Sequence, residues 1–242
     1  MTYFGFHLRF NGPVLLLAGA WAGRDLVSSG SLPMALLVLL LVMVFTTPWD
    51  NWAAYCGIWG FPKGQYWKRI GWLPVEEYLF FIIQSVEAML LTLVALRVLG
   101  PFQTPEHPWT WPQQGAACGL VLALWVAAGA VFRGRFGCHS RGHYAWHLFF
   151  WFLPVILLQW IIGWPVLLER AGVVLLVMAV LGTYLSLADL VAIKHGVWHF
   201  DEKQTTGHKI GPSMPWEEAA FFYLTSALVA QSYLILLPEA LR

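Results

Sequence analysis

Apolar stretches separated by short polar segments dominate the chain from one end to the other. Each stretch has the length of ~20 residues that a helix needs to cross the apolar core of a bilayer. We predict seven spans, which lie near 4–22, 33–55, 75–99, 114–132, 144–162, 165–192 and 215–237. The first span contains His7, Arg9 and Asn11 and no small-residue cleavage site, so we expect it to be retained rather than removed as a signal peptide.

The polar positions between the spans repeat within the chain. Ten residues recur in the same order in the second half. The spacing is identical as far as Phe61 and Phe200, and the loop that follows is about two residues longer in the second copy. The first set is Asp50, Ala53, Gly57, Trp59, Phe61, Pro74, Glu76, Glu77, Phe80 and Phe81, and the second is Asp189, Ala192, Gly196, Trp198, Phe200, Pro215, Glu217, Glu218, Phe221 and Phe222. Pro13 and Pro154, each followed by an apolar run, support the same alignment. The pattern indicates an internal duplication.

The duplication predicts the domain organisation. We expect a first repeat of three helices at 1–103, a linker with a fourth helix at 104–138, and a second repeat of three helices at 139–242. A single linker helix makes the repeats parallel, so both acidic loops lie on one membrane face. The predicted fold is all-α: a polytopic membrane protein with seven transmembrane helices, arranged as two parallel three-helix repeats plus one linker helix.

Composition agrees with this fold and orients it. The chain is 59% hydrophobic and 11% charged, which is typical of an integral membrane protein, and its net charge of +1 gives no case for nucleic acid. Ten basic residues share the face of the two loops: Arg9, Lys63, Lys68, Arg69, Arg133, Arg135, Arg141, Lys194, Lys203 and Lys209. Only Arg24, Arg97, Arg170 and Arg242 lie on the other face. This asymmetry predicts a cell-membrane protein whose N-terminus and acidic motifs are cytoplasmic and whose C-terminus is outside.

The repeated carboxylates are the candidate catalytic groups. Asp50 and Asp189 lie near the ends of helices, where the macrodipole and apolar surroundings both favour the neutral acid, so either is a candidate proton donor. The Glu pairs after Pro74 and Pro215 open helices, whose positive N-termini favour the anion; they suit proton acceptance or cation stabilisation. The alternatives are structural: close helix packing beside a capped Asp, in which Ala53 and Gly57 share its helix face, and ordinary helix-start chemistry for the Glu pairs.

Glu87 is a separate signal, because it falls near the middle of a predicted span, where a charge is expensive. It lies on the helix face of Glu76, and its counterpart in the second repeat is Leu228. The repeats have therefore diverged, which favours one composite site over two equal ones. The alternative is a protonated Glu87 hydrogen-bonded to a neighbouring helix.

Aromatic side chains recur beside the carboxylates. Aromatic faces stabilise a carbocation without trapping it, so we assign this set to substrate binding. It comprises Trp59, Phe61, Phe80, Phe81, Trp198, Phe200, Phe221 and Phe222.

Histidines and cysteines offer weaker signals. His139, His143 and His147 follow one helix stripe, and His195 and His199 repeat the spacing, but adjacent pairs are absent; we expect no metal and interpret them as interfacial groups or partners of the acids. Cys56, Cys118 and Cys138 form no CxxC pair, so we expect free, buried thiols.

The Asp…Gly-x-Trp-x-Phe…Pro-x-Glu-Glu pattern, present twice and in order, resembles the small membrane-type lycopene cyclases over essentially the whole chain. That family exists as two subunits, as one fused chain, or fused ahead of phytoene synthase in fungal bifunctional proteins. The resemblance implies proton-initiated, redox-neutral cyclisation of the ψ ends of lycopene to β-ionone rings. Asp50 or Asp189 would be the acid, and Glu76, Glu77, Glu217 and Glu218 the base or electrostatic stabilisers. It implies lycopene and the bilayer as partners, and leaves open an association with other carotenoid-biosynthesis enzymes.

Other function classes remain to be separated. A small-molecule transporter with three-plus-one-plus-three parallel repeats is one alternative, although its signals would lie mid-membrane. A cyclase of a longer carotenoid is another. A retinal photoreceptor is excluded because the last predicted span has no lysine. No Gly-rich dinucleotide fingerprint is present, so we expect no flavin and no other cofactor.

Overall fold

The computed structural model describes residues 1–100, 106–132, 134 and 136–242. The predicted boundary between the first repeat and the linker, at 103/104, lies outside these residues. So do Arg133 and Arg135 of the charge count.

Helices make up most of the described chain. They are α1 (Tyr3–Phe6), α2 (Gly12–Leu26), α3 (Leu32–Tyr55), α4 (Val75–Leu99), α5 (Trp111–Phe132), α6 (His143–Glu169), α7 (Ala171–Val177), α8 (Thr183–Lys194) and α9 (Trp216–Leu236). Two π-helical turns, η1 (His7–Asn11) and η2 (Met178–Gly182), join α1 to α2 and α7 to α8, and a 3-10 turn, η3 (Glu239–Leu241), ends the chain. The prediction of a mostly helical bundle is therefore confirmed, with six two-residue strands in the loops of the described chain.

Six helical segments of the described chain are long and apolar enough to cross a membrane. They are Leu32–Tyr55, Val75–Leu99, Trp111–Phe132, His143–Glu169, Ala171–Lys194 and Trp216–Leu236. The seventh predicted span, near 4–22, is divided between α1, η1 and α2 and stays a prediction. The break predicted near 163–164 is wrong: α6 continues through Gly163 and Pro165, and the chain turns at Arg170 instead.

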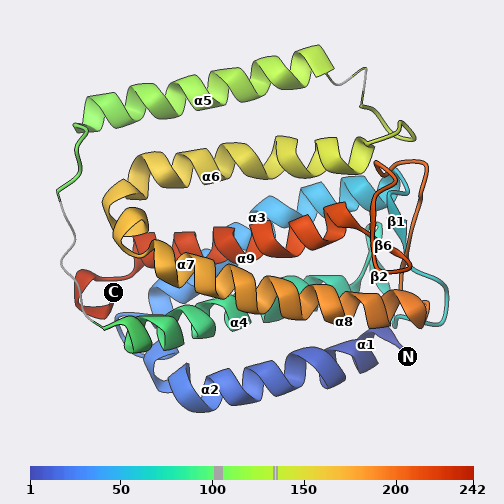
Figure 1. Ribbon diagram of the computed structural model, residues 1–242, viewed down its shortest axis with the longest axis horizontal. Coiled ribbons are helices and arrows are strands. Elements are labelled where there is room, and N and C mark those ends of the chain that lie inside the picture. The colour runs from blue at the N-terminus through green and yellow to red at the C-terminus, as the bar shows by residue number, and fades with distance from the viewer. Residues whose placement is uncertain (101–105, 133, 135) are drawn as a thin grey trace.

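The helices run along one axis, with the N-terminus and the loops at one end and the C-terminus at the other (Figure 1). The outermost helix is α5, which packs against α6 through contacts such as Trp125 on Phe150. The centre belongs to α4 and α9, the corresponding third helices of the two repeats. They contain the largest buried share of all the candidate spans, and Gln84 Nε2 of α4 donates to Thr225 Oγ1 of α9 at 2.8 Å.

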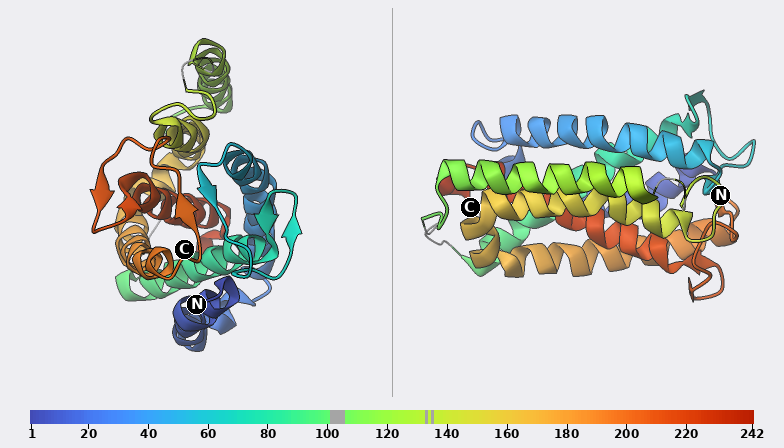
Figure 2. Two further views of the ribbon diagram at one scale, coloured as in Figure 1. Left: turned by 90° about the vertical axis from the view of Figure 1, so that its right-hand side faces the viewer. Right: turned by 90° about the horizontal axis from the view of Figure 1, so that it is seen from above.

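Short strands tie the two acidic loops together at one end of the bundle (Figure 2). β1 (Trp59–Gly60) pairs antiparallel with β4 (His199–Phe200), so that Trp59 of the first loop lies opposite Phe200 of the second. Each loop also closes its own two-residue hairpin, β2 (Arg69–Ile70) with β3 (Leu73–Pro74) and β5 (Lys209–Ile210) with β6 (Met214–Pro215). The β1–β4 pairing brings the two copies of the motif side by side.

The prediction of three free cysteines is wrong for two of them. Cys56 and Cys138 form a disulfide with their Cα atoms 5.1 Å apart, and Cys118 remains free. The partners are 82 residues apart in sequence, at the end of α3 and just before α6. Gln204 of the second loop connects the two sites, because its Oε1 accepts from the His139 N–H and its Nε2 donates to the Cys56 carbonyl. Cysteine spacing cannot reveal such a non-local contact.

Candidate active site

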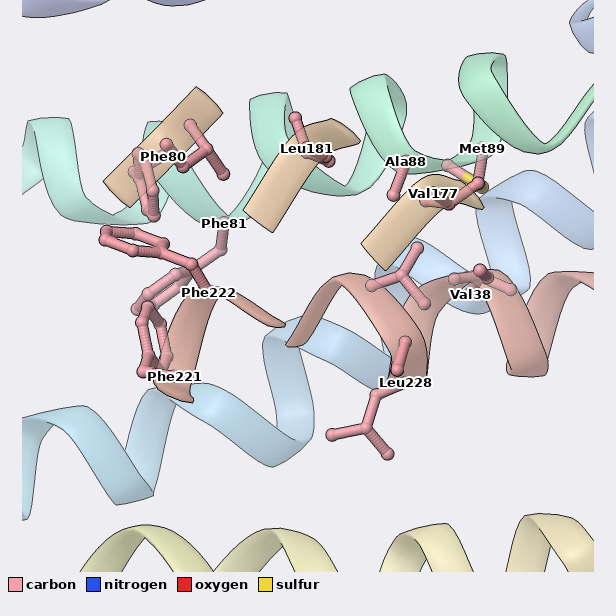
Figure 3. Packing of buried hydrophobic residues seen from close by; sticks show 14 of the residues in the cluster. Val38, Phe80, Phe81, Ala88, Met89, Val177, Leu181, Phe221, Phe222 and Leu228 are labelled. Carbon is pink, nitrogen blue, oxygen red and sulfur yellow. The ribbon is translucent and has the colours of Figure 1, made fainter. Parts of the chain in front are cut away.

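A small chamber lies at the loop end of the bundle, and half of the residues of the repeated motif line it. Its volume is about 40 Å³, which holds about three water molecules, since one needs roughly 10–15 Å³ of such space. The residues that line it are Tyr3, Trp49, Asp50, Trp59, Phe61, Glu77, Phe80, Tyr144, Trp198, Phe200, Glu218, Phe221 and Phe222. Figure 3 shows Phe80, Phe221 and Phe222 gathered between α4 and α9.

The first repeat contributes an aspartate, a glutamate and two hydrogen-bond donors. Asp50 Oδ1 accepts from Trp59 Nε1 at 2.9 Å, and Glu77 Oε2 accepts from the Tyr3 hydroxyl at 2.7 Å. Asp50 and Glu77 both line the chamber and lie close enough to interact. Two carboxyl groups that share one site favour holding a single proton between them over both being ionised.

The second repeat builds the same arrangement. Asp189 Oδ1 accepts from Trp198 Nε1 at 2.7 Å, and Glu218 Oε2 accepts from the Tyr144 hydroxyl. Asp189 differs from Asp50 in two respects: its Oδ2 has no hydrogen-bond partner, and it does not line the chamber.

A glycine after the helix end reverses the chain in each repeat and brings a tryptophan back to the aspartate of that helix. α3 ends at Tyr55, and Gly57 follows with φ of 72°; Gly196 after α8 has φ of 64°. Such left-handed glycines terminate helices and reverse the chain, which places Trp59 within reach of Asp50 nine residues earlier. The expectation that Gly57 belongs to a helical shelf beside Asp50 is therefore wrong, whereas Ala53 lies in α3 and is buried.

The two glutamates of each pair point in different directions. Glu77 and Glu218 face the chamber, whereas Glu76 and Glu217 turn toward their own loops. Glu76 Oε1 accepts from the Trp67 backbone N–H at 2.8 Å, and Glu217 Oε1 accepts from the Thr206 N–H at 2.7 Å. These hydrogen bonds support a role for Glu76 and Glu217 in positioning the loops.

Tyr3 and Tyr144 are members of the site that sequence reasoning missed. Their separation of 144 − 3 = 141 residues equals that of Glu77 and Glu218, 218 − 77 = 141, and that of Pro13 and Pro154. This matching offset is the sequence signal that could have identified them.

An apolar cavity of about 380 Å³ adjoins the chamber, a volume within the usual range for small-molecule sites. It lies between α3, α4, α6 and α9, and Phe221 lines both spaces. On α9 its lining runs from Phe221 to Leu236, which is roughly 22 Å at 1.5 Å per residue. Leu41 of α3 and Ile162 of α6 are about half exposed and form its rim, so the cavity opens sideways between these two helices. Phe81, predicted to bind substrate, lines this cavity and not the chamber.

Glu87 is not brought together with the other carboxylates. It is fully buried in α4, lines neither space, and neither of its oxygens has a hydrogen-bond partner. Its counterpart Leu228 lines the apolar cavity.

The predicted histidine stripe is only partly helical, because His139 precedes α6 with φ of 68°. His143 and His147 lie in α6 and contact different repeats. His143 Nδ1 is hydrogen-bonded to Gln204 Oε1 at 3.0 Å, and His147 Nε2 donates to the backbone carbonyl of Trp49 at 2.9 Å. Within the described ranges no group of three metal-ligating side chains gathers in one place.

The chain is similar to known proteins over most of its length. It is 32% identical to a lycopene beta-cyclase of Halobacterium salinarum over 199 residues, which is 82% of this chain and 80% of that protein. It is 29% identical to a bifunctional lycopene cyclase/phytoene synthase of Phycomyces blakesleeanus over 231 residues, 95% of this chain and 38% of that one. The corresponding protein of Blakeslea trispora is 27% identical over 95% of this chain. No family model and no solved structure matches.

Proposed function

The chain belongs to the family of membrane-type lycopene cyclases, and we propose that it converts the ψ ends of lycopene to β-ionone rings, giving γ-carotene and then β-carotene. One observation carries the proposal: a chamber of carboxyl and aromatic side chains adjoins a long apolar cavity that opens toward the lipid. The reaction is an isomerisation of the intramolecular lyase type, in which no atom is gained or lost.

We assign the proton donor to Asp50. It faces the chamber, whereas Asp189 does not, and the neighbouring carboxyl group of Glu77 favours a proton shared between the two residues. Asp50 protonates C2 of the ψ end, the C5=C6 double bond attacks the cation at C1, and the six-membered ring closes. Asp189 holds Trp198 in place through its hydrogen bond.

We assign the base to Glu218, which faces the same chamber from the second repeat. It removes the proton from C6 and leaves the C5=C6 double bond of a β ring. The proton taken from C6 equals the proton given to C2, so the cluster of Glu218, Glu77 and Asp50 can return it to Asp50 without net exchange. The Tyr144 hydroxyl fixes the orientation of Glu218.

The aromatic lining suits the cation that passes between these groups. Trp59 and Trp198 direct their indole N–H groups at the aspartates, and rings of both tryptophans line the chamber. Aromatic faces stabilise a cation by their quadrupole and offer it no lone pair to capture. The rest of the polyene would occupy the apolar cavity, which it reaches from the bilayer through the opening between α3 and α6.

We also propose the arrangement of repeats and the membrane orientation that the sequence predicts. In each half of the described chain a run of helices is followed by three two-residue strands and a long helix. This order supports parallel repeats at 1–103 and 139–242 around a linker at 104–138, with the helical run from α1 to α2 as the seventh span. The basic residues on the loop side support a cytoplasmic N-terminus and active site.

Pigment analysis of a lycopene-accumulating bacterial host that expresses this chain tests the function. We expect γ-carotene and β-carotene to replace lycopene. Unchanged lycopene, with the chain detected in the membrane fraction, would contradict the proposal. The sideways opening also leaves room for a carotenoid longer than the cavity, so a second host that accumulates a longer acyclic carotenoid distinguishes the two substrates.

A further inference from the structure

Three aromatic rings in mutual contact separate the chamber from the apolar cavity. Trp49 lines the chamber, Phe152 lines the cavity, and Phe221 lines both. The Trp49 ring stacks on Phe221 with centroids 5.3 Å apart and planes at 7°, and it contacts Phe152 at 5.0 Å. In this conformation the two spaces adjoin but are divided by these aromatic side chains.

His147 holds the central ring of this wall in place. Trp49 Nε1 donates to the His147 carbonyl at 3.3 Å, and His147 Nε2 donates to the Trp49 carbonyl at 2.9 Å. The two rings stack with centroids 5.3 Å apart and planes at 4°. This reciprocal pair joins α3 of the first repeat to α6 of the second, and both residues are buried.

The other repeat has no equivalent of this pair. The residue before Asp189 is Ala188, where the residue before Asp50 is Trp49. The residue three after Tyr3 is Phe6, where the residue three after Tyr144 is His147. Phe6 packs on Trp198 at 5.1 Å. The wall and its hydrogen bonds therefore exist on the side that has the cavity.

We propose that Trp49 is a gate, held by His147 as a positioning residue, through which the substrate's end group passes from the cavity into the chamber. The inference rests on the proposed function. The chamber has space for about three water molecules, which is too little for a branched isoprenoid end, so the end group must displace the ring. Trp49 then packs against the polyene behind the end group and leaves no room for water beside the cation.

Water capture gives this gate a chemical readout. If water reaches the cation at C1, its oxygen bonds to C1 and its extra proton passes to a carboxylate. The product is an acyclic tertiary alcohol, one water heavier than lycopene, formed without any oxidant or reductant. A gate that closes poorly therefore changes the product and not only the rate.

The test compares four single variants with the wild type in the lycopene-accumulating host. His147→Phe installs the ring that the first repeat carries at Phe6 and removes the histidine's hydrogen bond. Trp49→Phe removes the indole donor. Trp151→Phe is the matched control, because Trp151 Nε1 donates to Phe45 O at 3.2 Å across the same helix pair while its side chain lines neither space.

We expect the ratio of hydrated acyclic product to cyclised product to rise about tenfold in His147→Phe and in Trp49→Phe, the size of effect that one lost buried hydrogen bond produces, and to stay at the wild-type value in Trp151→Phe. His147→Gln, whose amide can still donate to the Trp49 carbonyl, should restore most of the wild-type ratio even if His147→Phe is poorly produced. An unchanged ratio in both gate variants, with rings formed by the wild type, overturns the gate alone. A wild type that leaves lycopene unchanged overturns the proposed function and the gate with it.

Discussion

The loop end of the bundle and its middle differ in how far the two repeats still agree. At the loop end each repeat presents a tyrosine, an aspartate, a tryptophan and a glutamate in the same hydrogen-bonded arrangement. In the middle, matched positions carry different chemistry. Phe45, Phe152 and Leu228 line the apolar cavity, whereas their counterparts Tyr184, Asn11 and Glu87 are polar. Under the proposed function, the proton-handling groups are paired whereas the cavity for the polyene is single, so one end of the substrate would react at a time.

The largest effect on the rate of ring formation should come from replacing the aspartates of the two repeats one at a time. Asp50→Asn removes the proposed donor, and we expect a loss of at least about 100-fold in the rate of ring formation, the usual contribution of a general acid. Asp189→Asn keeps a partner for Trp198 outside the chamber and should cost less than about tenfold by the loss of part of one hydrogen bond. Initial rates in membranes that contain equal amounts of each variant measure the difference. Equal losses would show that both aspartates donate.

Filling the single cavity should have the next largest effect. Ser232→Leu installs the residue that the first repeat carries at Leu91 and puts additional volume into the cavity. We expect about a tenfold lower rate, because overpacking a tight site costs on the order of 1–3 kcal/mol. Leu157→Phe is the matched control on the lipid-exposed side of α6 and should behave as the wild type. A wild-type rate in Ser232→Leu would place the polyene elsewhere.

The two tyrosines give a finer comparison of the chamber's halves. Tyr144→Phe removes the hydroxyl bonded to the proposed base, and Tyr3→Phe removes the one bonded to Glu77. We expect losses of about 3- to 10-fold in kcat, the range for one hydrogen bond of ~0.5–1.5 kcal/mol, with the larger loss in Tyr144→Phe. The reverse order would move the base to the first repeat.

The smallest effect on activity should come from Glu87. Glu87→Leu gives the first repeat the residue of the second, and because Glu87 lines neither space we expect an unchanged rate. Its buried oxygens have no partners, so their removal should raise the thermal midpoint, by roughly 2–4 °C for each 1 kcal/mol gained. A large loss of activity at an unchanged midpoint would restore Glu87 as a catalytic candidate.

The apolar stretches made the helical fold predictable from sequence. The repeated motif predicted that residues of both halves lie together, and the chamber lining contains residues of both copies. The choice between neighbouring glutamates was not predictable. Adjacent residues at a helix start differ by 100° in direction, and loop contacts decide that Glu77 faces inward and Glu76 outward. The Cys56–Cys138 pair and the wall at Trp49 rest on contacts between distant segments, which no local pattern encodes.

The opening between α3 and α6 also implies that the rate depends on the concentration of substrate within the membrane. A polyene that enters from the bilayer is encountered by diffusion in two dimensions, so the relevant quantity is the number of substrate molecules per lipid. Fusing the vesicles with substrate-free lipid would then slow the reaction, although the amounts of enzyme and substrate in the tube stay the same.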